Sequence, residues 1–226
     1  MDWTLRPIAH IESDFPTKFG IPRQSGVVES LTARVVFEEP YRVREALRGI
    51  EDFSRLWLIW GFSAAKREDW SPTVRPPRLG GNARVGVFAS RSPFRPNGLG
   101  LSCVRLLSVG EDGSLTVAGA DMMDGTPIFD VKPYLPYADA FPEEKGGFAA
   151  APWTRTLAVD CPEERLAALP REKRQALLDL LGEDPRPAYA EDGERVYGFP
   201  FAGCEVRFTV RGGTLTVVSV TEMTEK

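Results

Sequence analysis

The sequence predicts a mainly β protein, with a barrel or sandwich in its N-terminal part and a small α+β unit behind it. Three observations support this prediction. The β-rich runs are short, numerous and separated by Gly and Pro; strands and helices do not alternate as they do around a parallel sheet; and the composition shifts near residue 150. We therefore expect two domains, residues 1–150 and residues 151–226.

The predicted strands of the first domain follow one another closely along the chain. They are Ala33–Phe37, Leu56–Phe62, Val85–Phe88, Ser102–Val109, Ser114–Ala120 and Ile128–Val131. Residues 111–113, with the sequence Glu-Asp-Gly, predict a hairpin turn between two of them. Residues 41–50 place Val43, Leu47 and Ile50 at the spacing of one helical face, which predicts a short helix.

The second domain begins after Phe141–Pro152, a stretch rich in Pro, Glu, Gly and Ala that we interpret as a linker or exposed loop. The leucines and alanines that follow suit one or two helices, interrupted at Pro170 and ended at Gly182. Cys204–Val210 and Thr214–Val220 alternate around a glycine turn and predict a second hairpin.

Several classes of protein are excluded or disfavoured. The most apolar stretch, Leu56–Phe62, is much shorter than the roughly 20 residues of a membrane span, and the N-terminus lacks a signal-peptide pattern, so we expect a cytoplasmic protein. Three widely spaced cysteines and the single His10 argue against a metal site and against a histidine-dependent hydrolase. Gly98-Leu99-Gly100 lacks the rest of a dinucleotide fingerprint, and no P-loop motif occurs.

The charge is unevenly distributed. The whole chain carries a net charge of −4, but residues 71–110 contain six arginines and no lysine, aspartate or glutamate. These arginines are Arg75, Arg78, Arg84, Arg91, Arg95 and Arg105. Guanidinium groups present paired donors to phosphate or carboxylate, so the segment is a candidate anion-binding face. Surface ion pairing with acids elsewhere is the alternative explanation.

Three segments dense in Pro, Gly, Arg and polar residues contain four motifs that resemble those of a known family. Ile21-Pro22-Arg23-Gln24, residues 73–82, residues 91–97 and residues 124–134 follow one another as four ordered motifs. Together they resemble the TsaA-like, or TrmO, family of tRNA adenosine-37 N6-methyltransferases. The likeness runs from about residue 15 to 140, and the C-terminal unit stands in the family's usual place.

The resemblance implies a single-sheeted β-barrel that uses S-adenosylmethionine and acts as a homodimer, with cofactor sites close to the subunit interface. The implied substrate is tRNA, at the threonylcarbamoyl-modified adenosine next to the anticodon, chiefly in threonine tRNAs. The product carries an added N6-methyl group. No membrane or metal partner is expected.

The family's cofactor contacts can be carried over onto matching positions. They fall on Pro22, Arg23, Gln24, Ser63, Ala64, Arg91, Leu101, Met123, Asp124, Gly125 and Thr126. An arginine there could hold the methionine carboxylate and Asp124 could accept from the ammonium. Ser63-Ala64 stands where many members have His-Lys, so a side-chain contact is lost there or replaced by a backbone one. Gly98 replaces a proline of many relatives, which loosens its loop.

Candidate groups for catalysis and substrate binding lie on the same motifs. Asp130 and Tyr134 are candidates for the base that removes the proton from the attacking nitrogen, and a structural hydrogen bond is the alternative role for each. Lys132 suits a phosphate or carboxylate contact, Arg84 or Arg95 suits the threonyl carboxylate, and Asn97 belongs to the same substrate-binding set.

Two other functions remain open at this point. A non-catalytic barrel that binds RNA or a nucleotide would explain the altered Ser63-Ala64 position. A small-molecule methyltransferase would have no use for an arginine segment without acids.

Overall fold

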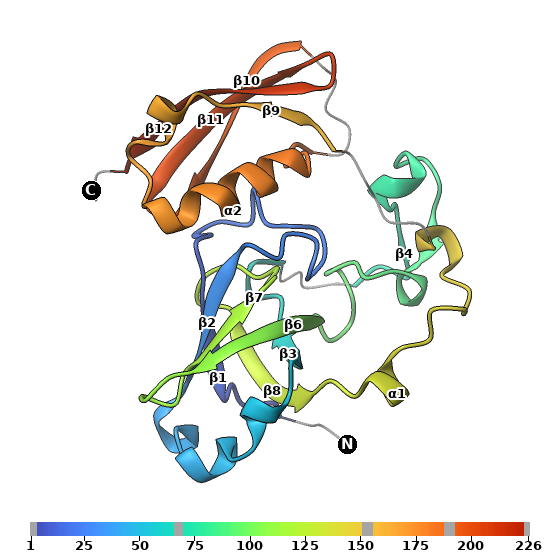
Figure 1. Cartoon of the computed structure of the whole chain (residues 1–226). Helices are drawn as coiled ribbons and strands as arrows, with labels where there is room; N and C mark the ends of the chain where they lie inside the picture. Colours follow the sequence, from blue (N-terminus) through green and yellow to red (C-terminus); the bar gives the residue numbers. More distant parts are fainter. Residues whose placement is uncertain (1–3, 66–69, 151–155, 188–192, 224–226) are drawn as a thin grey trace.

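The computed structural model describes residues 4–65, 70–150, 156–187 and 193–223, and it confirms the mainly β prediction. Within these residues, six strands form a closed barrel in the order β1-β2-β7-β6-β3-β8, and β8 pairs with β1 to complete the ring (Figure 1). The strands are β1 Ala9–Glu12, β2 Thr32–Phe37, β3 Arg55–Gly61, β6 Leu99–Val109, β7 Leu115–Ala118 and β8 Pro127–Pro133.

The barrel core follows from the two-residue alternation of its strands. On β3, Leu56, Leu58 and Trp60 are buried, and Trp57 and Ile59 between them face outward. Val104 on β6 and the other inward residues of the ring join the same hydrophobic cluster. The alternate side chains of β8, β3 and β6 therefore point to the outer face of the barrel, where they are available for other contacts.

Two sequence predictions in this part need correction, and one strand is not predicted by the sequence. The predicted strand Val85–Phe88 is a strand only at β5, Val85–Gly86, where it pairs with β4, Thr73–Val74; Val87–Ala89 is a 3-10 turn. The predicted helix over 41–50 is wrong as one helix, because Gly49 has a φ of +83° that ends any regular turn. The chain instead makes 3-10 turns at Glu39–Tyr41, Arg44–Leu47 and Ile50–Asp52. Strand β1 is too short and polar to stand out in the sequence.

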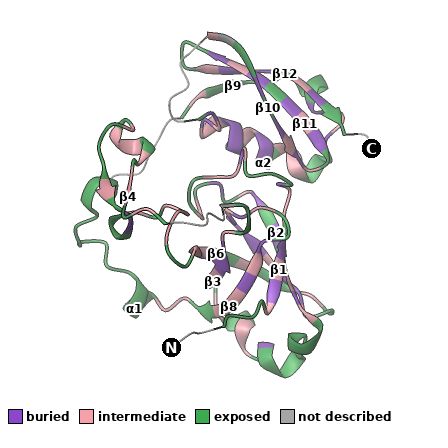
Figure 2. Ribbon diagram, turned by 180° about the vertical axis from the view of Figure 1, so that it is seen from behind, coloured by how far each residue is buried: buried purple, intermediate pink, exposed green. Residues whose placement is uncertain are grey.

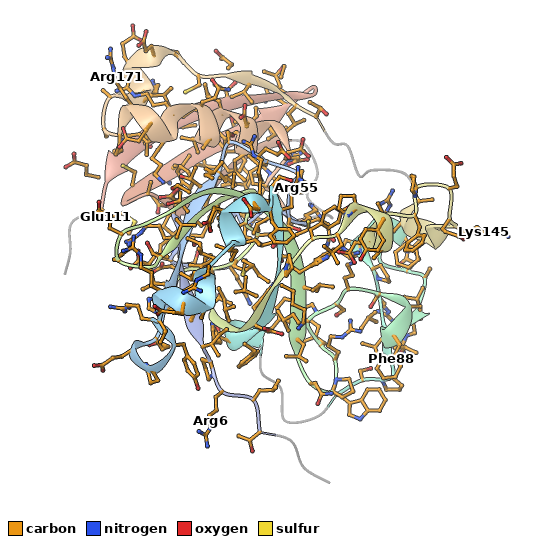
Figure 3. All side chains as sticks on the ribbon, turned by 60° about the horizontal axis from the view of Figure 1, so that its bottom comes forward. Arg6, Arg55, Phe88, Glu111, Lys145 and Arg171 are labelled. Atoms are coloured by element: carbon orange, nitrogen blue, oxygen red, sulfur yellow. The ribbon has the colours of Figure 1, made fainter. Side chains whose placement is uncertain are left out.

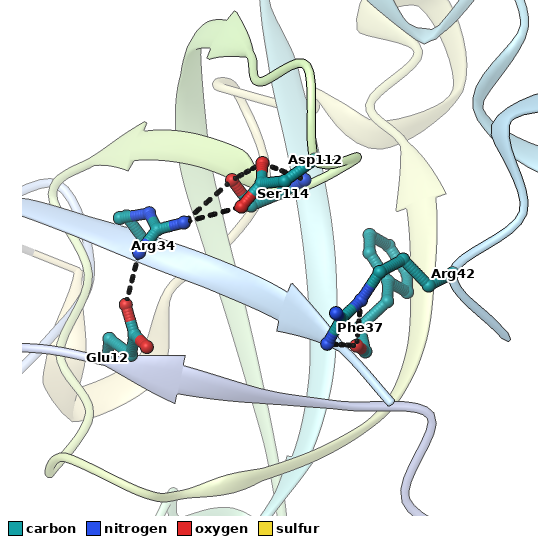
Figure 4. A network of polar contacts seen from close by, with 6 residues as sticks. All are labelled: Glu12, Arg34, Phe37, Arg42, Asp112 and Ser114. Carbon is teal, nitrogen blue, oxygen red and sulfur yellow. Dashed lines mark hydrogen bonds and ion pairs between the residues drawn. The ribbon is translucent and has the colours of Figure 1, made fainter. Parts of the chain in front are cut away.

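An arginine network fastens the barrel end that carries the predicted hairpin (Figure 4). The Arg34 guanidinium on β2 lies 2.7 Å from a Glu12 carboxylate oxygen on β1 and 2.8 Å from one of Asp112 in the β6–β7 turn. Hydrogen bonds from Ser114 lower the pKa of Asp112. The β6–β7 pairing, with Val109 opposite Leu115, confirms the turn at residues 111–113.

The C-terminal unit is a helix packed on a four-stranded sheet within the described residues. Its strands are β9 Ala158–Asp160, β10 Gly193–Phe201, β11 Cys204–Arg211 and β12 Thr214–Glu222, in the order β10-β11-β12-β9. A 3-10 turn, Glu163–Leu166, precedes α2, Arg171–Gly182, so the predicted interruption at Pro170 and stop at Gly182 are confirmed. The β11–β12 hairpin is confirmed as well, whereas β9 and β10 were not predicted.

The long connection between β1 and β2, residues 13–31, packs against the C-terminal unit. Phe15, Val28 and Leu31 belong to the same buried cluster as Leu177 of α2 and Phe208 of β11. Figure 1 shows this connection between α2 and the barrel, and Figure 2 shows buried residues on both sides of it. The hydrophobic core of the second unit is thus completed by the N-terminal part of the chain.

The segment after β8 runs along the side of the molecule. It contains α1, Pro136–Asp139, and a 3-10 turn, Gly147–Ala149, and it passes toward β4 (Figure 1). Residues 141–150 are exposed, in agreement with the predicted loop, whose last two residues lie outside the described ranges. Among the described residues, no helix has the length and apolar character needed to cross a membrane.

Candidate functional site

The loop of Arg23 and Gln24 lies beside Arg91, although 67 residues separate the two segments. The Arg91 guanidinium donates a 2.6 Å hydrogen bond to the Gln24 side-chain oxygen. The Gln24 amide nitrogen in turn donates to the Arg23 carbonyl at 2.6 Å. All three side chains belong to exposed residues. The structure therefore brings two of the four motifs, residues 21–24 and residues 91–97, into one polar cluster.

A partly buried carboxylate outside the four motifs, Asp121, lies next to this cluster. The Trp60 indole N–H donates to the Ser102 hydroxyl at 2.9 Å, and that hydroxyl donates to Asp121 Oδ1 at 2.5 Å. Burial raises the pKa of Asp121, while the Ser102 hydrogen bond and the charge of Arg91 act in the opposite direction. An acid directly after the apolar run that ends at Ala120 is the sequence signal that could have drawn attention to it.

The neighbouring backbone is held tightly around the same point. The Ser25 hydroxyl accepts a 3.1 Å hydrogen bond from the Cys103 amide on β6, and the Gly26 amide donates to the Gly119 carbonyl at 2.9 Å. A side chain at Gly100 would come within 2.3 Å of the Trp60 ring, so glycine is required for that ring to reach Ser102. Leu101, between Gly100 and Ser102, points outward and is 55% exposed.

The turn of Met123 to Thr126 is tied to the end of β1. The Asp124 carboxylate accepts a 2.9 Å hydrogen bond from the Ser13 amide, and the Gly125 amide donates to the Ile11 carbonyl at 2.8 Å. The Thr126 hydroxyl donates to the Met123 carbonyl at 2.6 Å. Asp124 thus has a structural partner of its own, whereas the charge of Arg91 acts on the pKa of Asp121.

The remaining cofactor and substrate candidates lie on the loops at the side of the barrel. Pro22 is half-buried beside Arg23, and Ser63 and Ala64 are exposed in a 3-10 turn directly after β3. The Arg95 guanidinium donates to the Ser90 carbonyl at 2.9 Å, so it shapes its own loop. Arg84 is exposed, with a 3.4 Å contact to the Thr73 hydroxyl, and Asn97 is exposed beside Gly98.

The two candidate bases share the outer face of the barrel with Leu101. In the strand register, Asp130 on β8 is opposite Ile59 on β3, and Ile59 is opposite Leu101 on β6. Strands lie about 4.8 Å apart, so Asp130 and Leu101 are roughly 10 Å apart across one strand. Tyr134 lies beyond Lys132 on the same face, with its ring 5.9 Å from that of Trp57.

Two ion pairs lie on this face. Lys132 Nζ lies 3.0 Å from Asp130 Oδ2, and the Val131 amide donates to Asp130 Oδ1 at 2.9 Å. Further along the face, Arg55 donates to a Glu29 oxygen at 2.6 Å, which raises the pKa of Arg55 and lowers that of Glu29. Figure 3 shows Arg55 close to the C-terminal unit, and Phe88 and Lys145 toward the opposite edge of the molecule.

His10 and the three cysteines are not part of this cluster of candidate residues, apart from the backbone amide of Cys103. His10 Nδ1 lies 2.8 Å from a Glu38 oxygen and is half-buried, as expected of a packing histidine. Cys103, Cys161 and Cys204 are free thiols whose pKa values burial raises, although only Cys204 is fully buried. A surface hollow of about 410 Å³ lies at the barrel end of Leu47 and Glu111, and none of the candidate residues lines it. Among the described residues, no group of three or more His, Cys, Asp or Glu is arranged to hold a metal ion.

Comparisons with known proteins agree with this picture over nearly the whole chain. Residues 10–140 match the family model of the tRNA-methyltransferase O N-terminal domain, and residues 153–223 match that of the TrmO C-terminal domain. The chain is 41% identical over 196 residues to the tRNA (adenine(37)-N6)-methyltransferase of Escherichia coli K12, covering 83% of each chain. It is 42% identical over 207 residues to a putative S-adenosylmethionine-dependent methyltransferase of Pseudomonas aeruginosa, covering 88% of each.

Solved structures show the same fold. A crystal structure of TrmO from Pseudomonas aeruginosa superimposes with a TM-score of 0.80 at 32% identity, covering 98% of this chain and 99% of that one. Another crystal structure of TrmO gives a TM-score of 0.79 at 33% identity, covering 98% and 100%. The likeness therefore includes the barrel and the C-terminal unit together.

Proposed function

The chain belongs to the tRNA-methyltransferase O family, and from this membership we propose that it methylates N6 of adenosine 37 in tRNA with S-adenosylmethionine as methyl donor. We propose further that the adenosine is the threonylcarbamoyl-modified one, chiefly in threonine tRNA. A cytoplasmic homodimer with cofactor sites near its subunit interface is part of the same proposal.

The observation that carries the proposal is the cluster around the Arg91–Gln24 hydrogen bond. It brings the loop of Arg23 and Gln24 next to the guanidinium group of Arg91, with the partly buried carboxylate of Asp121 beside them. Leu101, next to Ser102 on β6, adds an exposed apolar side chain on the outer face of the barrel. These groups fit the parts of S-adenosylmethionine. A guanidinium group can bind its carboxylate, a protein carboxylate can bind its ammonium group, and an apolar side chain can pack against its adenine or its methionine chain. The bound cofactor would supply a methyl group on a sulfonium. The neutral thioether that leaves when this methyl is transferred needs no acid.

The task of the protein is then to place the target nitrogen about 3 Å from that methyl carbon, in line with the bond to sulfur. The nitrogen of a threonylcarbamoyl-adenosine is conjugated with a carbonyl and is a poor nucleophile until it loses its proton. Asp130 and Tyr134 are the proposed bases, and Asp130 is favoured because it shares the row of Leu101 on the barrel surface. Lys132 Nζ, 3.0 Å from Asp130 Oδ2, holds the proposed base in an ion pair.

Recognition of the modified base needs a cation for its threonyl carboxylate. We propose Arg84 for this contact in preference to Arg95, because Arg95 donates strongly into its own loop whereas Arg84 is exposed with one long contact to Thr73. Asn97 and Lys132 complete the proposed substrate-binding set. A pocket with such groups leaves them unpaired against plain adenosine, which can discriminate by orders of magnitude.

Binding titrations separate this function from the two alternatives. Purified protein is titrated with S-adenosylmethionine and, separately, with threonine tRNA, and the proposal requires both to bind. A non-catalytic RNA-binding barrel would take the tRNA and not the cofactor. A small-molecule methyltransferase would take the cofactor and not the tRNA.

A further inference from the structure

The loop that carries Arg23 and Gln24 is seated on the C-terminal unit as well as on the barrel. Gly20, at the start of this loop, has a φ of +90°, and a side chain there would come within 2.5 Å of the Phe199 ring on β10. The Phe19 ring packs edge-on against the same Phe199, with centroids 6.1 Å apart, and Ile21 packs against the same core cluster. The start of the loop, residues 19–21, therefore packs directly against the C-terminal unit.

A buried ion pair lies where this surface meets the loop. After α2 ends, Asp184 takes a left-handed conformation with a φ of +51°. Its two carboxylate oxygens accept from Arg186, Nε to Oδ1 at 2.7 Å and Nη2 to Oδ2 at 2.9 Å. Both side chains are almost fully buried, with exposed fractions of 1% and 4%. A buried two-point pair between residues i and i+2 fixes the backbone between them.

The fixed backbone makes a direct contact with the candidate cofactor site. Arg23 Nη2 donates to the main-chain carbonyl of Arg186 at 3.1 Å. Arg23 is followed by Gln24, whose side-chain oxygen accepts from Arg91 at 2.6 Å. A continuous series of contacts thus leads from the Asp184–Arg186 pair to Arg91, from the end of α2 to the loop beside β6.

We propose that Asp184 and Arg186 are positioning residues of the cofactor site, and that through them the C-terminal unit sets the orientation of the Arg23 guanidinium. The proposal rests on the proposed function in taking Arg23 and Gln24 as cofactor-binding. It gives the C-terminal unit a role in cofactor binding that does not require that unit to contact tRNA.

The test compares Asp184→Asn with Lys173→Met in the full-length protein. Lys173 on α2 lies 2.7 Å from a carboxylate oxygen of Asp14, so this control breaks an ion pair between the same two parts of the chain, away from Arg23. Three quantities are measured: thermal unfolding, the dissociation constant for S-adenosylmethionine by calorimetry, and hydrogen exchange of a peptide spanning residues 20–26 in the cofactor-free protein. Ser25 and Gly26 are the amides of interest, because their backbone groups bond to Asp121 and Gly119.

We expect Asp184→Asn to weaken cofactor binding about tenfold or more and to speed exchange in residues 20–26, since it removes a charge-assisted two-point contact. Lys173→Met should lower the unfolding temperature without either effect. Arg186→Lys keeps the charge but not the two-point geometry, so it should also weaken cofactor binding and speed exchange in residues 20–26. If Asp184→Asn does not fold, the same measurements are made on Arg186→Lys.

Wild-type affinity together with wild-type exchange in a folded Asp184→Asn or Arg186→Lys protein would overturn the proposal. If the wild-type protein itself does not bind S-adenosylmethionine, the proposed function fails. The exchange comparison still decides then whether Asp184 and Arg186 order the loop. Failure of the function and failure of the positioning role are therefore distinguishable.

Discussion

The Arg91 guanidinium donates a 2.6 Å hydrogen bond to the side-chain oxygen of Gln24 and so joins two loops that are 67 residues apart. This contact holds a cation from the arginine segment, which contains no acids, next to the loop of residues 22–24. The partly buried Asp121 lies close enough for the charge of Arg91 to lower its pKa in part. The contact between Arg91 and Gln24 is the basis of the first prediction.

Arg91→Ala should weaken binding of S-adenosylmethionine by about ten- to a hundredfold, because a charge-assisted hydrogen bond is worth roughly 1.5–3 kcal/mol. The fold should be unchanged, since Arg91 is exposed. Calorimetric titration measures the effect. Arg42→Ala is the matched control: Arg42 bonds to the Phe37 carbonyl at the other end of the barrel, and its loss should leave the affinity at the wild-type value. Equal affinities in the two variants would remove Arg91 from the site.

Asp121→Asn should change the pH dependence of stability in a defined direction. Burial raises the pKa of Asp121 above its ordinary value of 3.8, so the folded protein takes up this proton at a higher pH than the unfolded chain does. The cost of burying the charge is fully present above the raised pKa. It disappears as the pH falls toward 3.8, so the wild type should gain stability relative to Asp121→Asn over that range.

Denaturant unfolding of both proteins at a series of pH values measures this difference. Asp112→Asn is a control of opposite sign, because the pKa of Asp112 is lowered and its contribution is present above 3.8 and lost at lower pH. A difference between wild type and Asp121→Asn that is constant with pH would contradict the assignment of a raised pKa to Asp121.

Asp130→Asn should lower kcat by about 10²-fold or more with little change in the cofactor dissociation constant, because a general base contributes typically 10²–10⁴-fold. Tyr134→Phe is its partner variant, since it removes only the hydroxyl and keeps the ring against Trp57. We expect it to retain kcat within about tenfold. Single-turnover methylation rates measure both variants, and the reverse order of effects would identify Tyr134 as the base.

The sequence predicted the central strands well and the special backbone poorly. Leu56–Phe62 is a short apolar run rich in residues that favour strands, and it predicts β3 within one residue at each end. In the 41–50 segment the apolar spacing is helical, but a left-handed Gly49 and an exposed Val43 divide it into 3-10 turns. Local pattern could not reveal which way Gly49 would turn.

The site was predictable only in part, for a related reason. The segments of Arg23 and Arg91 belong to the ordered motifs, and Leu101 is a cofactor contact that the resemblance implies. The structure brings the loops of Arg23 and Arg91 together beside Asp121. Asp121 carries no motif of its own, and its place depends on a hydrogen bond with Ser102 of the neighbouring strand β6, which no local sequence pattern reports. The attachment of residues 13–31 to the C-terminal unit depends on long-range packing, which sequence periodicity does not report.

Binding of tRNA should weaken with salt, because arginines in residues 71–110 would replace counterions on phosphates. Arg91 and Arg95 are engaged within the protein, so we expect exposed residues such as Arg75 to supply most of the effect. Arg75→Ala should reduce the slope of log affinity against log salt by about one. Arg34→Ala, in the Glu12–Asp112 network, should leave it unchanged. A wild-type affinity that does not vary with salt would mean that the segment is not an RNA face.

Nucleoside mass spectrometry measures the proposed transfer of one methyl group from S-adenosylmethionine to N6 of threonylcarbamoyl-adenosine 37. The protein and cofactor are incubated with threonine tRNA that carries the threonylcarbamoyl group and with the same tRNA lacking it, and both are digested to nucleosides. We expect a mass increase of one methyl group on the modified adenosine and little or none on the unmodified tRNA. Absence of methylation on both RNAs would contradict the enzyme, and equal methylation of both would contradict the substrate.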